Sequence, residues 1–218
     1  MKFFIDTANI NQIKEAHELG ILDGVTTNPS LMAKEGIKGH SNVLKHYVNI
    51  CEITSGDVSA EVLSTEYSSM LEEGIKLSKL NKKIVVKIPM TSDGIKVIKK
   101  LTDMGIKTNC TLIFSSGQAL LAAKAGATYV SPFVGRLDDI SSDGLTLIKD
   151  IKKIFSNYPE IKTKILSASL RNTMHIIECA KAGSDVVTCP LDVIKSLMNH
   201  PLTNSGLEKF LEDTKKFL

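Results

Sequence analysis

Short apolar runs rich in β-branched residues alternate along the chain with longer segments in which apolar residues recur at helical spacing. In segment 94–104, for example, Ile95, Ile98 and Leu101 are three positions apart, which places them on one side of a helix. The pattern predicts strands over 3–6, 24–27, 58–62, 84–88, 108–113, 129–133, 164–168 and 185–188. A strand followed by a helix, repeated eight times, predicts parallel strands joined by crossover helices.

The junctions between predicted helices and strands carry a second signal. Four helices end in a glycine that leads into the next strand, namely Gly20, Gly105, Gly126 and Gly183. Glycine suits the left-handed turn just past a helix end. The strands, in contrast, end in polar residues, and in an eightfold barrel all these ends meet at one mouth. We therefore predict an α/β fold with a single (β/α)8 TIM-barrel domain over residues 1–218 and an extra C-terminal helix.

The rival architecture is an open, doubly wound sheet. That fold usually carries a glycine-rich phosphate loop after its first strand. Segment 6–9 contains no glycine, so the pattern favours the barrel.

Composition excludes several other classes of protein. The 218 residues include 27 basic and 24 acidic side chains, a net charge of +3, which is too small to indicate a nucleic-acid partner. The longest apolar runs fall far short of the ~20 residues that cross a bilayer. The N-terminal apolar run is too short for a signal peptide, so we expect a cytoplasmic protein with no membrane association.

The four cysteines, Cys51, Cys110, Cys179 and Cys189, form no metal-ligand spacing with one another or with histidine. We interpret them as buried, reduced thiols. The sequence thus predicts neither a metal site nor a cofactor.

Lys87 is the clearest candidate for chemistry. It lies in the apolar run KIVVKIP at 83–89, where a period of two puts Val85 and Lys87 on one face of the strand. Inside a barrel such a lysine is shielded from water, which favours its neutral amine. A neutral amine attacks carbonyl groups and forms a Schiff base. The alternative is an edge-strand lysine whose amine reaches the solvent.

Asp6 and Glu61 stand at the ends of two other predicted strands. A barrel would bring both carboxylates to the mouth that holds Lys87, where they could transfer protons. Each carboxylate has two simpler alternatives, as the cap of the following helix or as the partner of a lysine, and the segment DTAN at 6–9 is a good helix start for Asp6.

Arg136 and Arg171 are the only arginines in the chain, against 25 lysines. They follow the sixth and seventh strands, so a barrel places them on neighbouring loops. Two guanidinium groups with a serine hydroxyl make a phosphate clamp. The alternative is an ion pair with Asp138, Asp139 or Glu178.

Three motifs together resemble the transaldolase family, and most closely its small-subunit branch, which includes the fructose 6-phosphate aldolases. They are FIDTAN at 4–9, GVTTNPSL at 24–31 and VVKIP at 85–89. The resemblance runs through nearly the whole chain in order. It implies an eightfold barrel and class I aldolase chemistry, in which a lysine rather than a metal activates the substrate.

The resemblance also assigns catalytic roles. Lys87 corresponds to the lysine that forms a Schiff base with the C2 carbonyl of a ketose. Asp6 corresponds to the carboxylate that takes the C4 hydroxyl proton as the C3–C4 bond breaks. Glu61 corresponds to the acid that works through a bound water with Thr111.

Further positions correspond to substrate-binding residues. Asn28 and Asn109 match residues that hold the dihydroxyacetone unit, with Ser131 nearby, and we expect Thr26 to bind the substrate as well. The phosphate-binding group corresponds to Arg136, Ser169 and Arg171, which agrees with the clamp inferred from the scarcity of arginine. Leu170 replaces the Phe that relatives often have between the Ser and the Arg, and it keeps that position apolar.

Two positions separate transferases from aldolases in the family. Transferases have Glu and Phe where this chain has Glu61 and Phe133, whereas the aldolases have Gln and Tyr. A Tyr hydroxyl would help to protonate and release bound dihydroxyacetone, which a Phe ring cannot do. We therefore expect transfer of the unit between sugar phosphates. The alternatives are an aldolase that releases dihydroxyacetone and a non-catalytic sugar-phosphate binder.

The same branch assembles as rings of five, paired into decamers, so the resemblance implies a homo-oligomer (pentamer or decamer). In such rings the C-terminal helix, expected here over 205–218, packs on a neighbouring subunit. Its apolar surface would come from Phe210, Leu211, Phe217 and Leu218.

Overall fold

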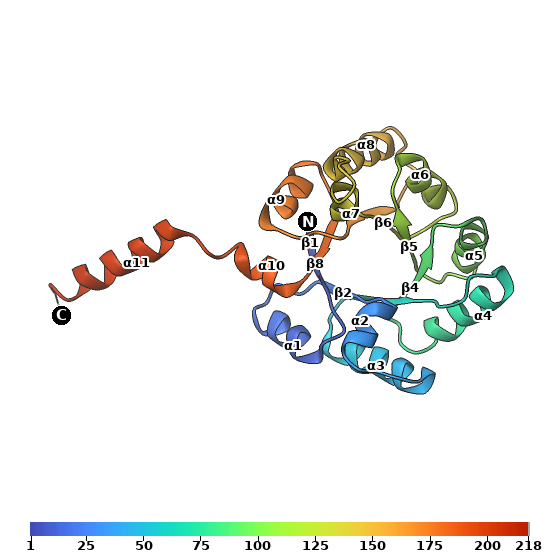
Figure 1. Ribbon diagram of the computed structural model, residues 1–218, viewed down its shortest axis with the longest axis horizontal. Coiled ribbons are helices and arrows are strands. Elements are labelled where there is room, and N and C mark those ends of the chain that lie inside the picture. The colour runs from blue at the N-terminus through green and yellow to red at the C-terminus, as the bar shows by residue number, and fades with distance from the viewer. Residues whose placement is uncertain (218) are drawn as a thin grey trace.

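The computed structural model describes residues 1–217 and contains a closed barrel of eight parallel strands in sequence order (Figure 1). The strands are β1 (Lys2–Asp6), β2 (Gly24–Thr26), β3 (Asp57–Glu61), β4 (Ile84–Pro89), β5 (Thr108–Ile113), β6 (Tyr129–Pro132), β7 (Lys164–Ser167) and β8 (Val186–Cys189). All eight predicted strands are confirmed, with ends that differ by one residue at most. The predicted (β/α)8 barrel is therefore the observed fold.

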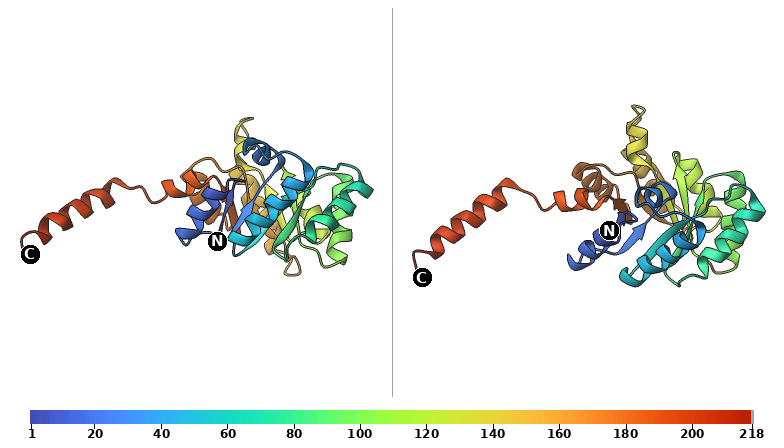
Figure 2. Two further views of the ribbon diagram at one scale, coloured as in Figure 1. Left: turned by 90° about the horizontal axis from the view of Figure 1, so that it is seen from below. Right: turned by 60° about the horizontal axis from the view of Figure 1, so that its bottom comes forward.

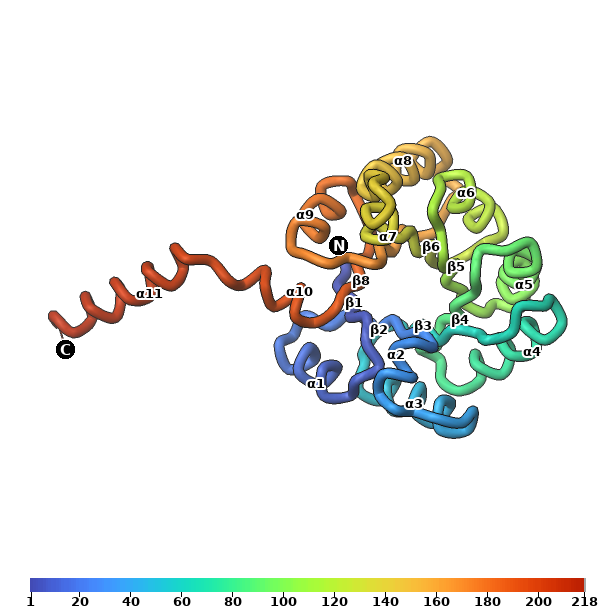
Figure 3. Tube along the Cα trace, viewed as in Figure 1, coloured from blue at the N-terminus to red at the C-terminus, as the bar shows by residue number. Residues whose placement is uncertain are grey.

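Eleven helices are present in the described part of the chain, and most surround the barrel (Figures 1 and 3). They are α1 (Ile10–Glu18), α2 (Pro29–Lys34), α3 (His40–Ile53), α4 (Tyr67–Ser78), α5 (Ser92–Asp103), α6 (Ser116–Lys124), α7 (Val134–Asp138), α8 (Gly144–Ser156), α9 (Thr173–Lys181), α10 (Leu191–Ser196) and α11 (Pro201–Thr214). The short helices α2 and α7 follow the carboxyl ends of β2 and β6, and both rise on the same side of the barrel (Figure 2).

The glycines at the helix ends behave as the sequence predicts. Gly20, Gly105, Gly126 and Gly183 all have positive φ, between 72° and 93°. Each follows a helix directly and turns the chain toward the next strand, a conformation that costs other residues energy.

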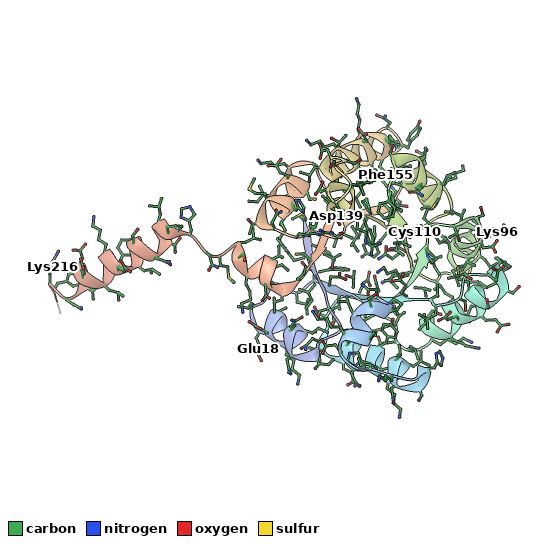
Figure 4. The ribbon with its side chains drawn as sticks, viewed as in Figure 1. Glu18, Lys96, Cys110, Asp139, Phe155 and Lys216 are labelled. Atoms are coloured by element: carbon green, nitrogen blue, oxygen red, sulfur yellow. The ribbon has the colours of Figure 1, made fainter. Side chains whose placement is uncertain are left out.

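Apolar side chains fill two regions. The larger core lies between the outer face of the barrel and the helices, and the side chains of Cys110 and Phe155 in Figure 4 belong to it. A smaller cluster fills the barrel lumen and consists of Phe4, Val85, Tyr129, Leu166 and Val186. Gly24 faces this cluster, because a Cβ there would overlap the ring of Phe4.

The C-terminal helix α11 extends away from the barrel in every view (Figures 1 and 2). It begins at Pro201, four residues before the expected start, since proline is favoured in the first turn of a helix. It ends at Thr214, and Leu218, which we expected in this helix, lies outside the described residues. None of the helices within residues 1–217 is both long enough and apolar enough to span a membrane.

Candidate active site

Along the barrel axis, the side chains that fill the lumen change from apolar to mostly polar between one layer and the next. Alternate residues of a strand share a face, so the residue two positions after each member of the lumen cluster points into the same lumen one layer higher. Phe4 is thus followed by Asp6, Val85 by Lys87, Tyr129 by Ser131, Leu166 by Ala168 and Val186 by Thr188. At the carboxyl ends of the strands, a layer that is polar except at Ala168 thus lies on an apolar floor.

This polar layer forms a cavity of about 120 Å³. Its lining includes most of the residues that the sequence singled out, with one acidic and two basic side chains. The lining residues are Asp6, Thr26, Asn28, Lys87, Ser131, Phe133, Arg136, Ala168, Ser169 and Thr188. The guanidinium group of Arg136 in this lining suits an anionic ligand such as a phosphate ester.

Lys87 is 6% exposed and its amine is held by two acceptors. The Nζ atom lies 2.9 Å from Oε2 of Glu61 and donates to the carbonyl oxygen of Thr27 at 3.0 Å. Adjacent strands bring the pair together, because Glu61 is the register partner of Lys87 across β3 and β4. The alternative of a lysine that reaches solvent is therefore wrong.

Asp6 accepts a hydrogen bond from the Thr26 hydroxyl at 2.7 Å. It does not cap the following helix, since Asn9 accepts from the first backbone N–H groups of α1. The Thr26 hydroxyl also lies 2.7 Å from that of Thr188. Sequence reasoning missed Thr188, although its place at the end of the eighth strand was a usable signal.

A second polar network crosses the lumen from β3 to β6. The Ser131 hydroxyl donates to Oδ1 of Asn109 at 2.7 Å, and Nδ2 of Asn109 donates to the hydroxyl of Ser59 at 3.1 Å. Both amide atoms of Asn109 are thereby fixed. Ser59 is the second residue that the sequence analysis did not single out.

Thr111 lies in an irregular part of β5. The register to β6 shifts between Cys110 and Ile113, and Leu112 adopts a left-handed φ of 59°. Such bulges re-aim side chains near functional sites. The Thr111 hydroxyl is buried and has no hydrogen-bond partner among the described residues, so a donor and acceptor remain for a ligand or water at this point.

Asn28 contributes to the cavity from the start of α2. Its side chain caps that helix by accepting from the N–H of Leu31 at 2.9 Å. The cap fixes the position of Asn28, and the proline that follows it starts the helix.

Arg136 lines the cavity from the short helix α7, and Ser169 lines it from the loop that follows β7. The guanidinium carbon of Arg136 lies 4.9 Å from the centre of the Phe133 ring, a cation–π contact that directs the side chain. Ser169 has a left-handed φ of 60°, a strained conformation for a residue other than glycine.

Arg171 lies outside the lining of this cavity and is half exposed. Its guanidinium group donates two hydrogen bonds of 2.5 Å to the carboxylate of Asp139, and these bonds raise the pKa of Arg171. Asp139 lies at the carboxyl end of α7 (Figure 4). The ion pair that the sequence left open as an alternative is thus formed in this structure.

Burial keeps the cysteine thiols protonated. All four are unpaired thiols in the interior, and loss of solvation raises the pKa of Cys110 and of Cys189 to about 12. Within residues 1–217, no group of three or more His, Cys, Asp or Glu side chains is arranged to hold a metal ion.

A larger cavity, of about 770 Å³, lies at the opposite end of the barrel. It is lined by the segments that precede β6 and β7, including Thr128 and Thr163. None of the predicted site residues reaches it, and barrel enzymes build their sites at the other end.

Comparison with known proteins shows the family of the chain. The profile of the family described as "Transaldolase/Fructose-6-phosphate aldolase" matches residues 3–218. The chain belongs to this family. The resemblance found from the three motifs, and with it the prediction of a transaldolase-family enzyme, is confirmed.

Close relatives of this transaldolase-family chain occur in several bacteria. A "Probable transaldolase" of Cytophaga hutchinsonii is 67% identical over 99% of both chains, and one of Bacteroides thetaiotaomicron is 66% identical over 99% of both. A third, from Porphyromonas gingivalis, is 62% identical over 99% of this chain and 98% of the relative.

Proposed function

We propose that this transaldolase-family enzyme moves a dihydroxyacetone unit between sugar phosphates through a Schiff base on Lys87. The donor would be fructose 6-phosphate or sedoheptulose 7-phosphate, and the acceptor erythrose 4-phosphate or glyceraldehyde 3-phosphate. The observation that carries the proposal is the position of the Lys87 amine. It is buried in a cavity that also holds a carboxylate, Asp6, and a guanidinium group, Arg136.

The first step requires a neutral amine. The 2.9 Å contact between Nζ of Lys87 and Oε2 of Glu61 gives a direct path for a proton from the ammonium to the carboxylate. The amine then adds to the C2 carbonyl of the ketose to give a carbinolamine. The Glu61 carboxyl group returns the proton to the departing hydroxyl, and loss of water leaves the protonated Schiff base.

Bond cleavage follows. Asp6 takes the proton of the C4 hydroxyl, the C3–C4 bond breaks, and its electron pair flows toward the iminium nitrogen to give an enamine. The aldose leaves, and the enamine carbon attacks the aldehyde of the acceptor in the reverse sequence. The hydrogen bond from the Thr26 hydroxyl orients the Asp6 carboxylate for this role.

The phosphate group would lie at the rim, near Arg136 and Ser169. Arg171 would join them after leaving Asp139. The network of Asn109 and Ser131, together with Asn28 and the free hydroxyl of Thr111, would hold the hydroxyl groups of the three-carbon unit and a water between Thr111 and Glu61.

Borohydride trapping tests the Schiff base. Fructose 6-phosphate and borohydride should add a reduced sugar to the peptide that contains Lys87, as seen by mass spectrometry. Lys87→Met should abolish both labelling and turnover. Lys100→Met, on the exposed side of α5, should change neither. Sugar-phosphate affinity without labelling would instead indicate a binding protein.

Release of glyceraldehyde 3-phosphate from fructose 6-phosphate, with and without erythrose 4-phosphate, separates a transferase from an aldolase. A transferase releases it only with the acceptor. Equal release without acceptor would mean that Glu61 and Phe133 do not control the fate of the intermediate.

We also propose that α11 packs against a second copy of the chain in a ring of five or a pair of such rings. None of its residues is buried, and Leu207, Phe210 and Leu211 lie on one side of the helix with more than half of each side chain exposed. Light scattering on the wild type and on Phe210→Glu, with Lys209→Glu as the control, tests this. A monomeric wild type at micromolar concentration would contradict it.

The proposed reaction takes place in the cytoplasm. Four reduced, buried thiols suit a reducing compartment. Cell fractionation with activity measurement checks the location.

A further inference from the structure

The hydrogen bonds between β2 and β3 stop at the level of Lys87. Thr27 donates its N–H to the carbonyl of Ser59 at 3.3 Å. In a parallel ladder the next bond would run from the N–H of Glu61 to the carbonyl of Thr27. That backbone bond is not formed, although both residues lie in the described part of the chain.

Each of the two separated groups has a side-chain partner instead. The Thr27 carbonyl accepts from Nζ of Lys87 at 3.0 Å. The Glu61 N–H donates to the hydroxyl oxygen of Tyr47 at 3.3 Å. A buried backbone N–H without an acceptor destabilises a fold. The Tyr47 hydroxyl accepts from the Glu61 N–H and so avoids this cost where the β2–β3 ladder is interrupted.

Tyr47 approaches this point from outside the barrel. It lies on α3, which packs against β3, and only 2% of the residue is exposed. Burial raises the pKa of its hydroxyl, which therefore stays neutral at physiological pH. The lysine approaches the same gap from the lumen, so one side chain from each side replaces a single ladder bond.

We propose that Tyr47 is a positioning residue for the Schiff-base lysine, because it holds the β2–β3 ladder open and so reserves the Thr27 carbonyl for the amine. This inference rests on the proposed function of Lys87. The Thr27 carbonyl and the Glu61 carboxylate are two fixed acceptors for Nζ of Lys87. They orient the amine so that its remaining side faces the cavity. Without the Tyr47 hydroxyl, the Glu61 N–H donates to the Thr27 carbonyl instead. Both acceptors of the Lys87 amine, the Thr27 carbonyl and the Glu61 carboxylate, then move.

The expected defect concerns chemistry rather than substrate affinity. Tyr47 does not line the cavity, and the proposed phosphate contacts come from α7 and the loop after β7. Displacing the amine slows its attack on the C2 carbonyl, whereas the remote phosphate is held equally well in the ground state. The signature is therefore a lower kcat with an unchanged KM.

Tyr47→Phe removes only the hydroxyl and is the test variant. Tyr129→Phe is the matched control, because Tyr129 is equally buried and its hydroxyl donates to Asp57 at 2.8 Å, at the other end of the lumen. For Tyr47→Phe we expect kcat and the rate of borohydride trapping to fall about 5- to 20-fold, with KM within twofold. For Tyr129→Phe we expect both rates within twofold, whatever its loss of thermal stability.

Equal trapping rates in Tyr47→Phe and the wild type would overturn the positioning role, as would equal losses in the two variants. An unlabelled wild type would remove Lys87 as the reacting residue, and the proposed function with it. If Tyr47→Phe does not fold, a crystal structure of the wild type decides. A Glu61 N–H bonded to Tyr47 supports the role, and one bonded to Thr27 overturns it.

Discussion

Arg171 and Asp139 form a two-point ion pair at the rim of the barrel, with both hydrogen bonds 2.5 Å long. The pair occupies the guanidinium group that the proposed clamp needs for a phosphate. Asp139 is thus a competitor that any phosphate ester must displace. Water screens the charges of an exposed pair of this kind, so it contributes little to stability and the exchange is easy.

Neutralising this competitor should strengthen phosphate binding. We expect Asp139→Asn to lower the inhibition constant of inorganic phosphate about two- to fivefold, in line with an exposed ion pair. The control is Asp138→Asn, because that carboxylate contacts His175 instead. Arg171→Ala should raise the KM of the ketose phosphate with little change in kcat. A weaker inhibition in Asp139→Asn would show that the carboxylate orients Arg171 rather than competes for it.

The left-handed backbone conformation of Ser169 should lower the free energy of unfolding, while the Ser169 hydroxyl contributes to phosphate binding. Ser169→Gly relieves the strain at φ 60° and is expected to raise the free energy of unfolding by about 1 kcal/mol, while KM rises through loss of the hydroxyl. Ser141 has a φ of 61° in an exposed turn, so Ser141→Gly should stabilise the protein without changing KM. Urea unfolding and steady-state kinetics measure both effects, and an unchanged KM in Ser169→Gly would remove Ser169 from the clamp.

Phe133 should decide how long the three-carbon intermediate survives. A hydroxyl on its ring would face the cavity and supply a proton to the enamine, so Phe133→Tyr should increase acceptor-independent release of glyceraldehyde 3-phosphate. Phe114 packs against Phe133 with ring centres 5.6 Å apart but does not line the cavity. Phe114→Tyr is therefore the control, and similar release from both variants would contradict this role for Phe133.

Alkaline pH should destabilise the fold through its buried thiols. Folding raises the pKa of Cys110 and Cys189 to about 12, whereas an unfolded thiol ionises near ~8.5. The unfolded chain therefore releases protons that the folded chain keeps, and stability falls as pH rises above that value.

Between pH 7.5 and 9.5 the ionisation of each of these two thiols in the unfolded chain should lower the free energy of unfolding by about 1 kcal/mol. Urea unfolding under reducing conditions measures the loss, as one cooperative transition if residues 1–218 form a single domain. Cys189→Ala should show a shallower decline with pH than the wild type. Parallel declines would contradict the contribution of this thiol.

Periodicity in the sequence determined the strands and which residues of a strand share a face, and the closed barrel then decided which face points into the lumen. A strand admits only two side-chain directions, so once Val85 belongs to the apolar floor, Lys87 must occupy the layer above it. The same logic brings Asp6 and Ser131 to one cavity, because closing eight parallel strands leaves a single mouth for their carboxyl ends. The resemblance carried by the three family motifs then implied a catalytic role for each of these positions.

The tertiary structure alone decided which groups meet around those positions. Tyr47 belongs to a helix with no strand-end signal, and its contact with Glu61 depends on how α3 packs against β3. Arg171 has a long side chain with several possible partners, and only the path of the loop after β6 puts Asp139 within reach. Strand periodicity is a local property of the backbone, whereas these contacts join segments far apart in the chain and exist only once the barrel and its helices have packed.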